Sequence, residues 1–265
     1  MIFGGLQKLT LLDYPGITAC TVFTVGCDFA CPFCQNASLI DKTGDGSLSY
    51  SSGRVRQRTV PCLTIHCHIL GFLATRQGLL DGVCISGGEP LLQDGLESFI
   101  DEVKELGFLV KMDTNGSDPV KLLKLIETGK IDYVAMDIKN APEKYPQTVG
   151  LPGYDISPIE DSINILRLGT IPYEFRTTVV KEFHTGDDLL SIARWISGVN
   201  RHEVSDASPL KVSEERSGAE KYFLQKFVDS DGVKQKGLHC YSDEEMQQLA
   251  EIVKAVLPTV ELRGV

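Results

Sequence analysis

Three cysteines stand within eight residues of the chain, in the stretch GCDFACPFCQN: Cys27, Cys31 and Cys34. A structural zinc site or an ordinary iron–sulfur site takes four protein ligands. A site with three thiolates leaves one coordination position open, and an open position is where a small molecule can bind and react. The stretch therefore indicates a metal centre that does chemistry.

Two other interpretations of the cysteines remain open. Their spacing of i, i+4 and i+7 is that of one face of a helix with buried thiols, but Pro32 argues against it because an interior proline costs about 3 kcal/mol. A zinc site would draw its fourth ligand from Cys62, His66, Cys67 or His68. The favoured interpretation is a [4Fe–4S] cluster, because one short loop can wrap a cuboidal cluster and leave its fourth iron for a bidentate small ligand.

The cysteine loop must be positioned by secondary structure, and the sequence predicts strands that alternate with helices along the chain. Apolar, β-rich runs predict strands at 19–26, 82–86, 108–114, 133–139, 174–180, 222–228 and 259–265. Most of them are apolar on both faces, as strands of a covered parallel sheet are. Strands alternating with helices predict an α/β fold, either a barrel or partial barrel or an open doubly wound sheet. The cysteine loop follows a strand's carboxyl end, which is the active face of α/β barrels.

Local signals mark where three of the intervening helices begin. Ser157 and Glu160 form a predicted capping box with a proline at the first helical position, and Ser242 and Glu245 form a second one. Asp94 is the predicted cap of the helix LESFIDEVKEL, whose apolar residues fall on one stripe.

We expect one domain over residues 1–265, because α/β barrels commonly reach this size as a single unit. Two segments do not fit the alternating pattern and are predicted as long loops or insertions, namely 44–71 and 200–218. The first is rich in Ser and Arg and then reads VPCLTIHCHILG, and the second is polar and aperiodic.

Composition limits the environment and the partners. The chain carries 26 basic and 36 acidic residues and a net charge of −10, which argues against nucleic acid as a partner. No apolar run is long enough to span a membrane, and the start lacks the features of a secretory signal. Eight cysteines without such a signal favour the reducing cytoplasm, where thiols bind metals or do redox work.

The stretch CDFACPFC has the spacing C-x3-C-x2-C with an aromatic residue before the last cysteine, and it resembles the signature of the radical S-adenosylmethionine (SAM) enzymes. Further motifs occur where that family has them: SGGEP at 86–90, DTNG at 113–116, MDIK at 136–139 and LDYPG at 12–16. Together they closely resemble the glycyl-radical-enzyme activating proteins, above all the type that activates anaerobic ribonucleoside-triphosphate reductase.

That resemblance implies a partial (β/α)6 barrel of the TIM type, with a [4Fe–4S] cluster on Cys27, Cys31 and Cys34 and with SAM on its open iron. It further implies a glycyl radical enzyme as the partner, the anaerobic ribonucleotide reductase in the first place, and a flavodoxin- or ferredoxin-like electron donor. The activity would be reductive cleavage of SAM to a 5′-deoxyadenosyl radical, which removes a hydrogen from a glycine of the partner.

The resemblance also gives roles to residues that bind SAM. Gly87 and Gly88 would permit close backbone approach to its methionine end, and Glu89 would hold its amino group directly or shape that loop. The backbone of Phe33 would contact the adenine, and Asn115 belongs to the same cofactor-binding set.

The resemblance also implies roles for charged residues around the same cofactor. Lys139 and Arg176 would pair with the SAM carboxylate. Asp113, Thr114 and Asp137 would hold a monovalent cation, and Asp13 would lie near the cluster facing the substrate loop. Each residue also has an ordinary interpretation, such as an Asn-Gly turn at 115–116 or an ion pair of Asp137 with Lys139. Two other functions stay open, a radical SAM enzyme acting on a small molecule and a non-catalytic iron–sulfur or zinc protein.

Overall fold

The structure is a computed structural model, and it describes residues 1–40, 62–198 and 221–265. The chain divides into two compact units. The first comprises Met1–Asp28, Asn36–Thr114 and Lys124–Tyr133, and the second Phe29–Gln35, Asn115–Leu123 and Val134–Val265. Each unit combines strands and helices, and a single domain over 1–265 stays a prediction.

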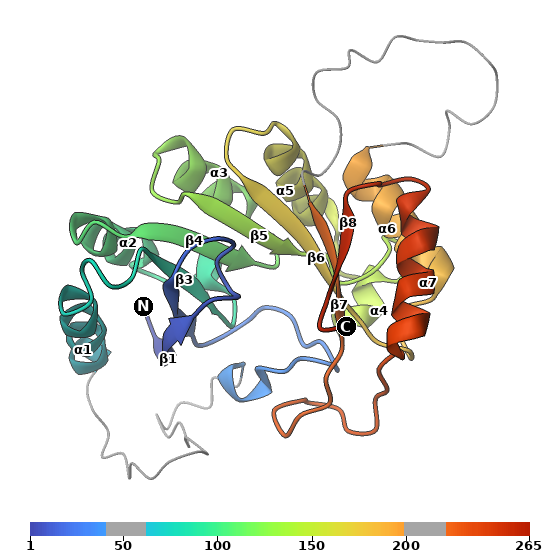
Figure 1. Cartoon of the computed structure of the whole chain (residues 1–265), viewed down its shortest axis with the longest axis horizontal. Helices are drawn as coiled ribbons and strands as arrows, with labels where there is room; N and C mark the ends of the chain where they lie inside the picture. The colour runs from blue at the N-terminus through green and yellow to red at the C-terminus, as the bar shows by residue number, and fades with distance from the viewer. Residues whose placement is uncertain (41–61, 199–220) are drawn as a thin grey trace. The chain divides into compact units, whose positions relative to one another are not determined.

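The first unit contains the strands β1 (Phe3–Thr10), β2 (Ala19–Thr24), β3 (Gly82–Gly87) and β4 (Leu109–Thr114) (Figure 1). They lie side by side in chain order, β1 antiparallel to β2 and the others parallel. Its helices are α1 (Cys62–Ala74) and α2 (Leu96–Glu105), with short 3-10 turns at Ala37–Leu39 and Pro90–Leu92. The helix α2 packs on β4 and beside α1.

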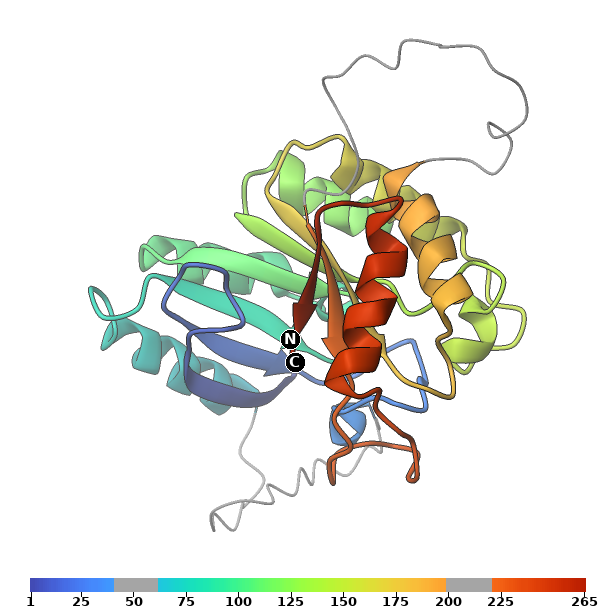
Figure 2. The same ribbon diagram turned by 45° about the vertical axis from the view of Figure 1, so that its right-hand side comes forward.

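The strands that follow are β5 (Tyr133–Asp137), β6 (Tyr173–Val179), β7 (Tyr222–Lys226) and β8 (Val260–Arg263), all parallel. The helices are α3 (Pro119–Glu127), which spans the boundary between the units, α4 (Tyr145–Thr148), α5 (Ser157–Arg167), α6 (Gly186–Ser197) and α7 (Asp243–Lys254). The helix α7 packs against α6 and against β7 and β8 (Figure 2).

All seven predicted strands are present, because continuous runs of Val, Ile, Phe and Met suit strands covered on both faces. The strand β1 was not predicted. Its sequence FGGLQKLT has two glycines and a polar middle, and residues 7–9 are exposed, so it lacks the apolar pattern of the others. Antiparallel pairing with β2 supplies its backbone hydrogen bonds instead.

One of the three predicted helix starts is correct. The Ser242 hydroxyl accepts a hydrogen bond from the Glu245 amide at 3.2 Å, and the Ser242 amide donates to the Glu245 carboxylate at 2.6 Å. The box at Ser157 is wrong, because Ser157 is already helical and donates its amide to the Asp155 carboxylate. The cap at Asp94 is also wrong, because Gly95, in the left-handed region with φ 75°, is the residue that precedes α2.

The loop prediction for 44–71 is wrong over its last ten residues, which belong to α1. The Cys and His residues concealed a helical pattern in which Ile69 and Leu73 are buried four residues apart. His66 pairs with Glu102 of α2, and its ring packs edge-on against Phe99. Residues 44–61 and the second irregular segment, 200–218, lie outside the described residues.

A buried ion pair connects β6 to β8. The Glu174 carboxylate is fully buried and accepts two hydrogen bonds from the Arg263 guanidinium, at 2.8 and 2.9 Å. That guanidinium also lies 3.4 Å from the centre of the Phe223 ring. The contacts therefore hold Arg263 in place from two sides.

We expect Arg263→Ala to lower the free energy of unfolding by about 1.5–3 kcal/mol, because it removes both hydrogen bonds that the guanidinium donates to the buried Glu174 carboxylate. Urea denaturation measures this loss. Lys254→Ala is the matched control, since it removes one partner of the exposed pair with Glu251 and should cost at most about 1 kcal/mol. Equal losses in the two variants would contradict the assignment of a buried charge.

Candidate functional site

The predicted site residues divide between the two units. The first unit contains Asp13, Cys27, Gly87, Gly88, Glu89, Asp113 and Thr114. The second contains Cys31, Phe33, Cys34, Asn115, Asp137, Lys139 and Arg176.

In the first unit, the end of β3 approaches the start of the cysteine loop backbone to backbone. A Cβ atom on Gly88 would lie 2.1 Å from the Gly26 carbonyl oxygen, and one on Gly87 would lie 2.4 Å from the Thr24 nitrogen. The Gly26 carbonyl accepts the amide hydrogen of Glu89 at 2.7 Å. Only glycine fits at 87 and 88, so the pair fixes the course of the chain immediately before Cys27.

Glu89 is buried, with 1% of its surface exposed. Its Oε1 accepts hydrogen bonds from the Leu91 amide at 3.0 Å and from the Thr114 hydroxyl at 2.7 Å. The carboxylate thus joins the turn after β3 to the end of β4. Of the two roles expected for Glu89, these contacts favour that of shaping the loop.

Asp113 is engaged on both carboxylate oxygens. One forms an ion pair with Lys111, whose side chain is fully buried, and the other accepts from the Ser86 hydroxyl at 3.1 Å. A cation bound at Asp113 would have to share its carboxylate with the Lys111 ammonium. Asp13 accepts a hydrogen bond of 2.5 Å from the Thr21 hydroxyl.

In the second unit, Cys31 is buried and Cys34 is half-buried, and a turn closed by the Cys34 amide on the Cys31 carbonyl at 3.2 Å connects them. Burial raises the pKa of the Cys31 thiol to about 11, although the nearby Lys139 ammonium opposes the rise. A metal ion bound at Cys31 would displace the thiol proton, and the Lys139 ammonium would favour that displacement.

Asp137 at the end of β5 binds two cationic side chains. The Lys139 ammonium lies 3.0 Å from its Oδ2, and Nε of Arg176 on β6 lies 2.8 Å from its Oδ1. Burial acts to raise the pKa of Asp137, but Arg176 and Lys139 outweigh it and hold the pKa at about 2. The three side chains carry a net charge of +1, which suits a site for a carboxylate.

This ion-pair group predicts a pH dependence of stability. Because the pKa of Asp137 is depressed in the folded chain, its stabilisation is present above pH 4 and is lost as the pH falls towards 2. The difference in unfolding free energy between the parent chain and Asp137→Asn should shrink by about 1 kcal/mol between pH 6 and pH 3. Urea titrations at the two pH values measure it, and a difference that does not change with pH would contradict the pairing.

Phe33 is buried against Phe183 and His184, with ring centroids 5.4 and 6.0 Å away. His184 was not predicted as part of the site, and no pattern in the sequence marks it. Its Nδ1 accepts the Val180 amide hydrogen at 3.1 Å, so its Nε2 carries the proton and donates to the Lys139 carbonyl at 2.8 Å. Burial lowers the pKa of His184, so this side chain, which contacts both Phe33 and the Lys139 carbonyl, is neutral.

Two predicted residues have ordinary local partners. The Asn115 side chain, 5% exposed, accepts the Ser117 amide hydrogen at 2.9 Å, which is an Asx turn. Cys27 is half-buried, and its sulfur lies 3.8 Å from a carboxylate oxygen of Asp28.

The possible fourth zinc ligands differ in their surroundings. Among the side chains that the structure describes, which do not include that of Cys62, no three His, Cys, Asp or Glu are grouped to hold one metal ion. His66 is paired with Glu102, and Cys67 is exposed.

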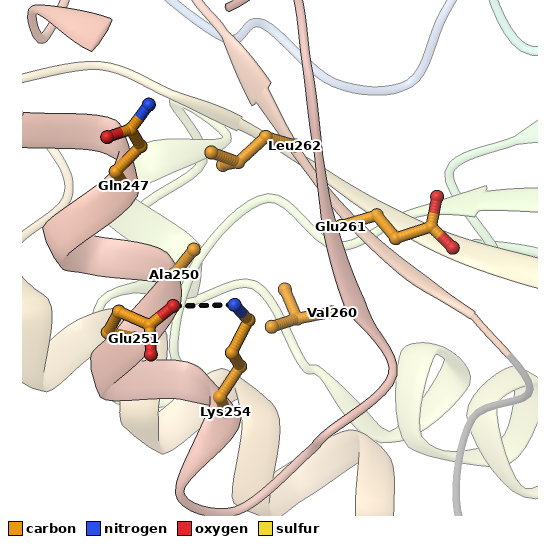
Figure 3. A pocket seen from close by; sticks show the side chains of 7 residues that line it. All are labelled: Gln247, Ala250, Glu251, Lys254, Val260, Glu261 and Leu262. Atoms are coloured by element: carbon orange, nitrogen blue, oxygen red, sulfur yellow. Dashed lines mark hydrogen bonds and ion pairs between the residues drawn. The ribbon is translucent and has the colours of Figure 1, made fainter. Parts of the chain in front are cut away.

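A pocket of about 380 Å³ lies between α7 and β8 (Figure 3). Seven residues line it: Gln247, Ala250, Glu251, Lys254, Val260, Glu261 and Leu262. None of them is a predicted site residue, and the pair of Glu251 with Lys254 lies within it. No helix in the described parts of the chain has the length and hydrophobicity to cross a membrane.

Comparisons with known proteins agree with this picture. The family model "Radical SAM superfamily" matches residues 21–196. A protein of Methanocaldococcus jannaschii, named as a candidate glycyl-radical enzyme activating enzyme, is 26% identical over 268 residues, which cover 100% of this chain and 96% of its own.

Two solved structures share the fold. A domain of the pyruvate-formate lyase-activating enzyme from Bacteroides vulgatus has a TM-score of 0.52 at 17% identity, covering 69% of this chain and 99% of its own. SuiB of Streptococcus suis, bound to S-adenosylmethionine, has a TM-score of 0.61 at 12% identity, covering 91% of this chain but 49% of its own. These likenesses confirm the predicted α/β fold of the partial TIM-barrel type over the open doubly wound alternative.

Proposed function

Because the chain belongs to the radical SAM superfamily, we propose that it activates a partner enzyme by generating a glycyl radical on it. The observation that carries the proposal is the motif CDFACPFC within the matched residues, in a chain that aligns over its full length with a relative named for this activity. The chain is a radical SAM enzyme, and the proposal concerns what it acts on.

The residues present fit the cofactors that this function needs. Cys27, Cys31 and Cys34 provide three thiolates for a [4Fe–4S] cluster, a soft donor set suited to iron. Gly87 and Gly88 let the turn after β3 pack against the backbone of Thr24 and Gly26, and we propose that this turn contacts the methionine end of SAM. When bound, the reduced cluster and SAM would supply the radical chemistry that removes a hydrogen atom from a glycine of the partner.

In this proposal, side chains of the protein bind SAM and orient it. Lys139 and Arg176, fixed by Asp137, would attract the SAM carboxylate, and the Phe33 backbone would contact its adenine. Glu89 and Asn115 would shape the surrounding turns. Asp113, Thr114 and Asp137 are proposed as ligands of a monovalent cation, which Lys111 would compete with at Asp113. Asp13 would face the substrate loop.

The partner that we propose is anaerobic ribonucleoside-triphosphate reductase, with a flavodoxin- or ferredoxin-like donor of the electron. The support is the resemblance of the motifs LDYPG and DTNG to activating proteins of that type. We propose that both partners are met in the cytoplasm, because a reducing compartment suits a chain with eight cysteines.

Production of 5′-deoxyadenosine tests the core of this proposal. The chain is reconstituted anaerobically with iron and sulfide, reduced with dithionite and given SAM. We expect 5′-deoxyadenosine that depends on the reductant, and a glycyl radical signal in electron paramagnetic resonance once the reductase is added. A folded, cluster-bearing chain that forms no 5′-deoxyadenosine would overturn the radical SAM activity, and one that acts only on a metabolite would overturn the partner.

A further inference from the structure

The segment between β7 and α7 lies beside the cysteine loop (Figures 1 and 2), and backbone hydrogen bonds join the two. The Gln235 amide donates to the Pro32 carbonyl at 2.8 Å, and the Lys234 amide donates to the Cys34 carbonyl at 3.2 Å. In the other direction, the Gln35 side chain donates to the Val228 carbonyl at 3.0 Å. Residues from about 200 positions later in the chain thus bind both sides of the Cys34 turn.

Gly232 stands at the closest approach of the two segments. A Cβ atom at this position would lie 2.4 Å from the Gln35 carbonyl oxygen, a backbone atom that cannot rotate away. The neighbouring Val233 is buried and its amide donates to the Ser230 carbonyl at 3.0 Å, so the glycine turn is closed and anchored. The close contact therefore requires glycine for steric reasons.

Other contacts of the cysteine loop involve different atoms, such as the Phe33 ring that packs against Phe183. Within residues 29–35, the Cys34 amide bonds to Cys31 and the Ala30 amide bonds to the Val149 carbonyl at 2.8 Å. Neither contact ties the carbonyls of Pro32 and Cys34. The segment after β7 satisfies these two polar groups and fixes the orientation of the peptides next to the Cys34 thiolate.

We propose that residues 228–235 are a positioning element of the iron–sulfur cluster, with Gly232 as the residue that permits their contact with the cysteine loop. The inference rests on the proposed cluster and adds a function for a segment outside the cysteine motif. Groups that orient metal ligands commonly alter metal affinity 10–100-fold when they are changed. Hydrogen bonding and exposure near the thiolates also set the reduction potential of a cluster.

The test compares Gly232→Ala with the parent chain and with Gly71→Ala, whose added Cβ meets nothing within 4 Å. Each is reconstituted anaerobically, and loss of the cluster to EDTA is followed by absorbance. We expect Gly232→Ala to lose its cluster about 10-fold faster than the parent chain. We also expect a changed electron paramagnetic resonance spectrum and midpoint potential, while Gly71→Ala stays like the parent.

A second variant covers the case in which Gly232→Ala fails to fold. Gln35→Ala removes the hydrogen bond to Val228 without adding bulk, and it should speed cluster loss about 3-fold, the effect of roughly one modest hydrogen bond. Folded variants with the parent's EDTA rate, spectrum and potential would overturn the positioning role. A parent chain that forms no cluster at all would instead overturn the proposed function, so the two failures are distinguishable.

Discussion

Replacing any one of Cys27, Cys31 and Cys34 by alanine is expected to abolish SAM cleavage and to leave the chain without a stable [4Fe–4S] cluster. Three thiolates already leave one iron for SAM, and with two a second iron would have no protein ligand. We therefore expect activity to fall at least about 100-fold, with iron and sulfide content lowered in parallel.

The measurement is iron, sulfide and 5′-deoxyadenosine per chain after anaerobic reconstitution. Cys240→Ser and Cys67→Ser are matched controls, because both thiols are exposed and neither belongs to the motif. Both should keep the cluster and the activity. Full SAM cleavage in any one of the three motif variants would show that the ligand assignment is incorrect, and loss of metal in Cys67→Ser would revive the zinc interpretation.

The fold could be predicted where burial on both faces left a plain signal. Runs such as VCI at 83–85 and VAM at 134–136 place apolar residues at every position, so the predicted strands agree with β3 and β5 to within a few residues at their ends. The sequence did not predict the elements whose secondary structure depends on tertiary contacts. The strand β1 is stabilised by pairing with β2. The helix α1, in a segment rich in Cys and His, is stabilised by the burial of Ile69 and Leu73.

The candidate site shows the same division. Motifs within a few residues of one another, such as the three cysteines or Gly87 with Gly88, could be recognised because their chemistry is local. The partners of these residues could not. His184 contacts the Lys139 carbonyl, 45 residues away in the sequence, and Gln235 contacts the Pro32 carbonyl, about 200 residues away. Only the folded chain brings such positions together.

Gly88→Ala is the second substitution with a large expected effect. Its Cβ would lie 2.1 Å from the Gly26 carbonyl oxygen, so the turn after β3 and the start of the cysteine loop must separate. Overpacking of this kind costs about 1–3 kcal/mol, and here the hydrogen bond from Glu89 to the same carbonyl is also strained. We expect a lower free energy of unfolding by that amount and at least a 10-fold loss of SAM cleavage, about 1.4 kcal/mol in the barrier.

Gly71→Ala in α1 is the control for this prediction, because it should raise the free energy of unfolding where Gly88→Ala should lower it. The same methyl group added there meets nothing within 4 Å, and alanine exceeds glycine in helix propensity by about 1 kcal/mol, so this variant should be more stable than the parent chain. Urea unfolding and 5′-deoxyadenosine assays on both variants separate a steric conflict at the proposed SAM surface from a general intolerance of added bulk. If Gly88→Ala retains the stability and activity of the parent, the close approach of the two backbones is not required for the site.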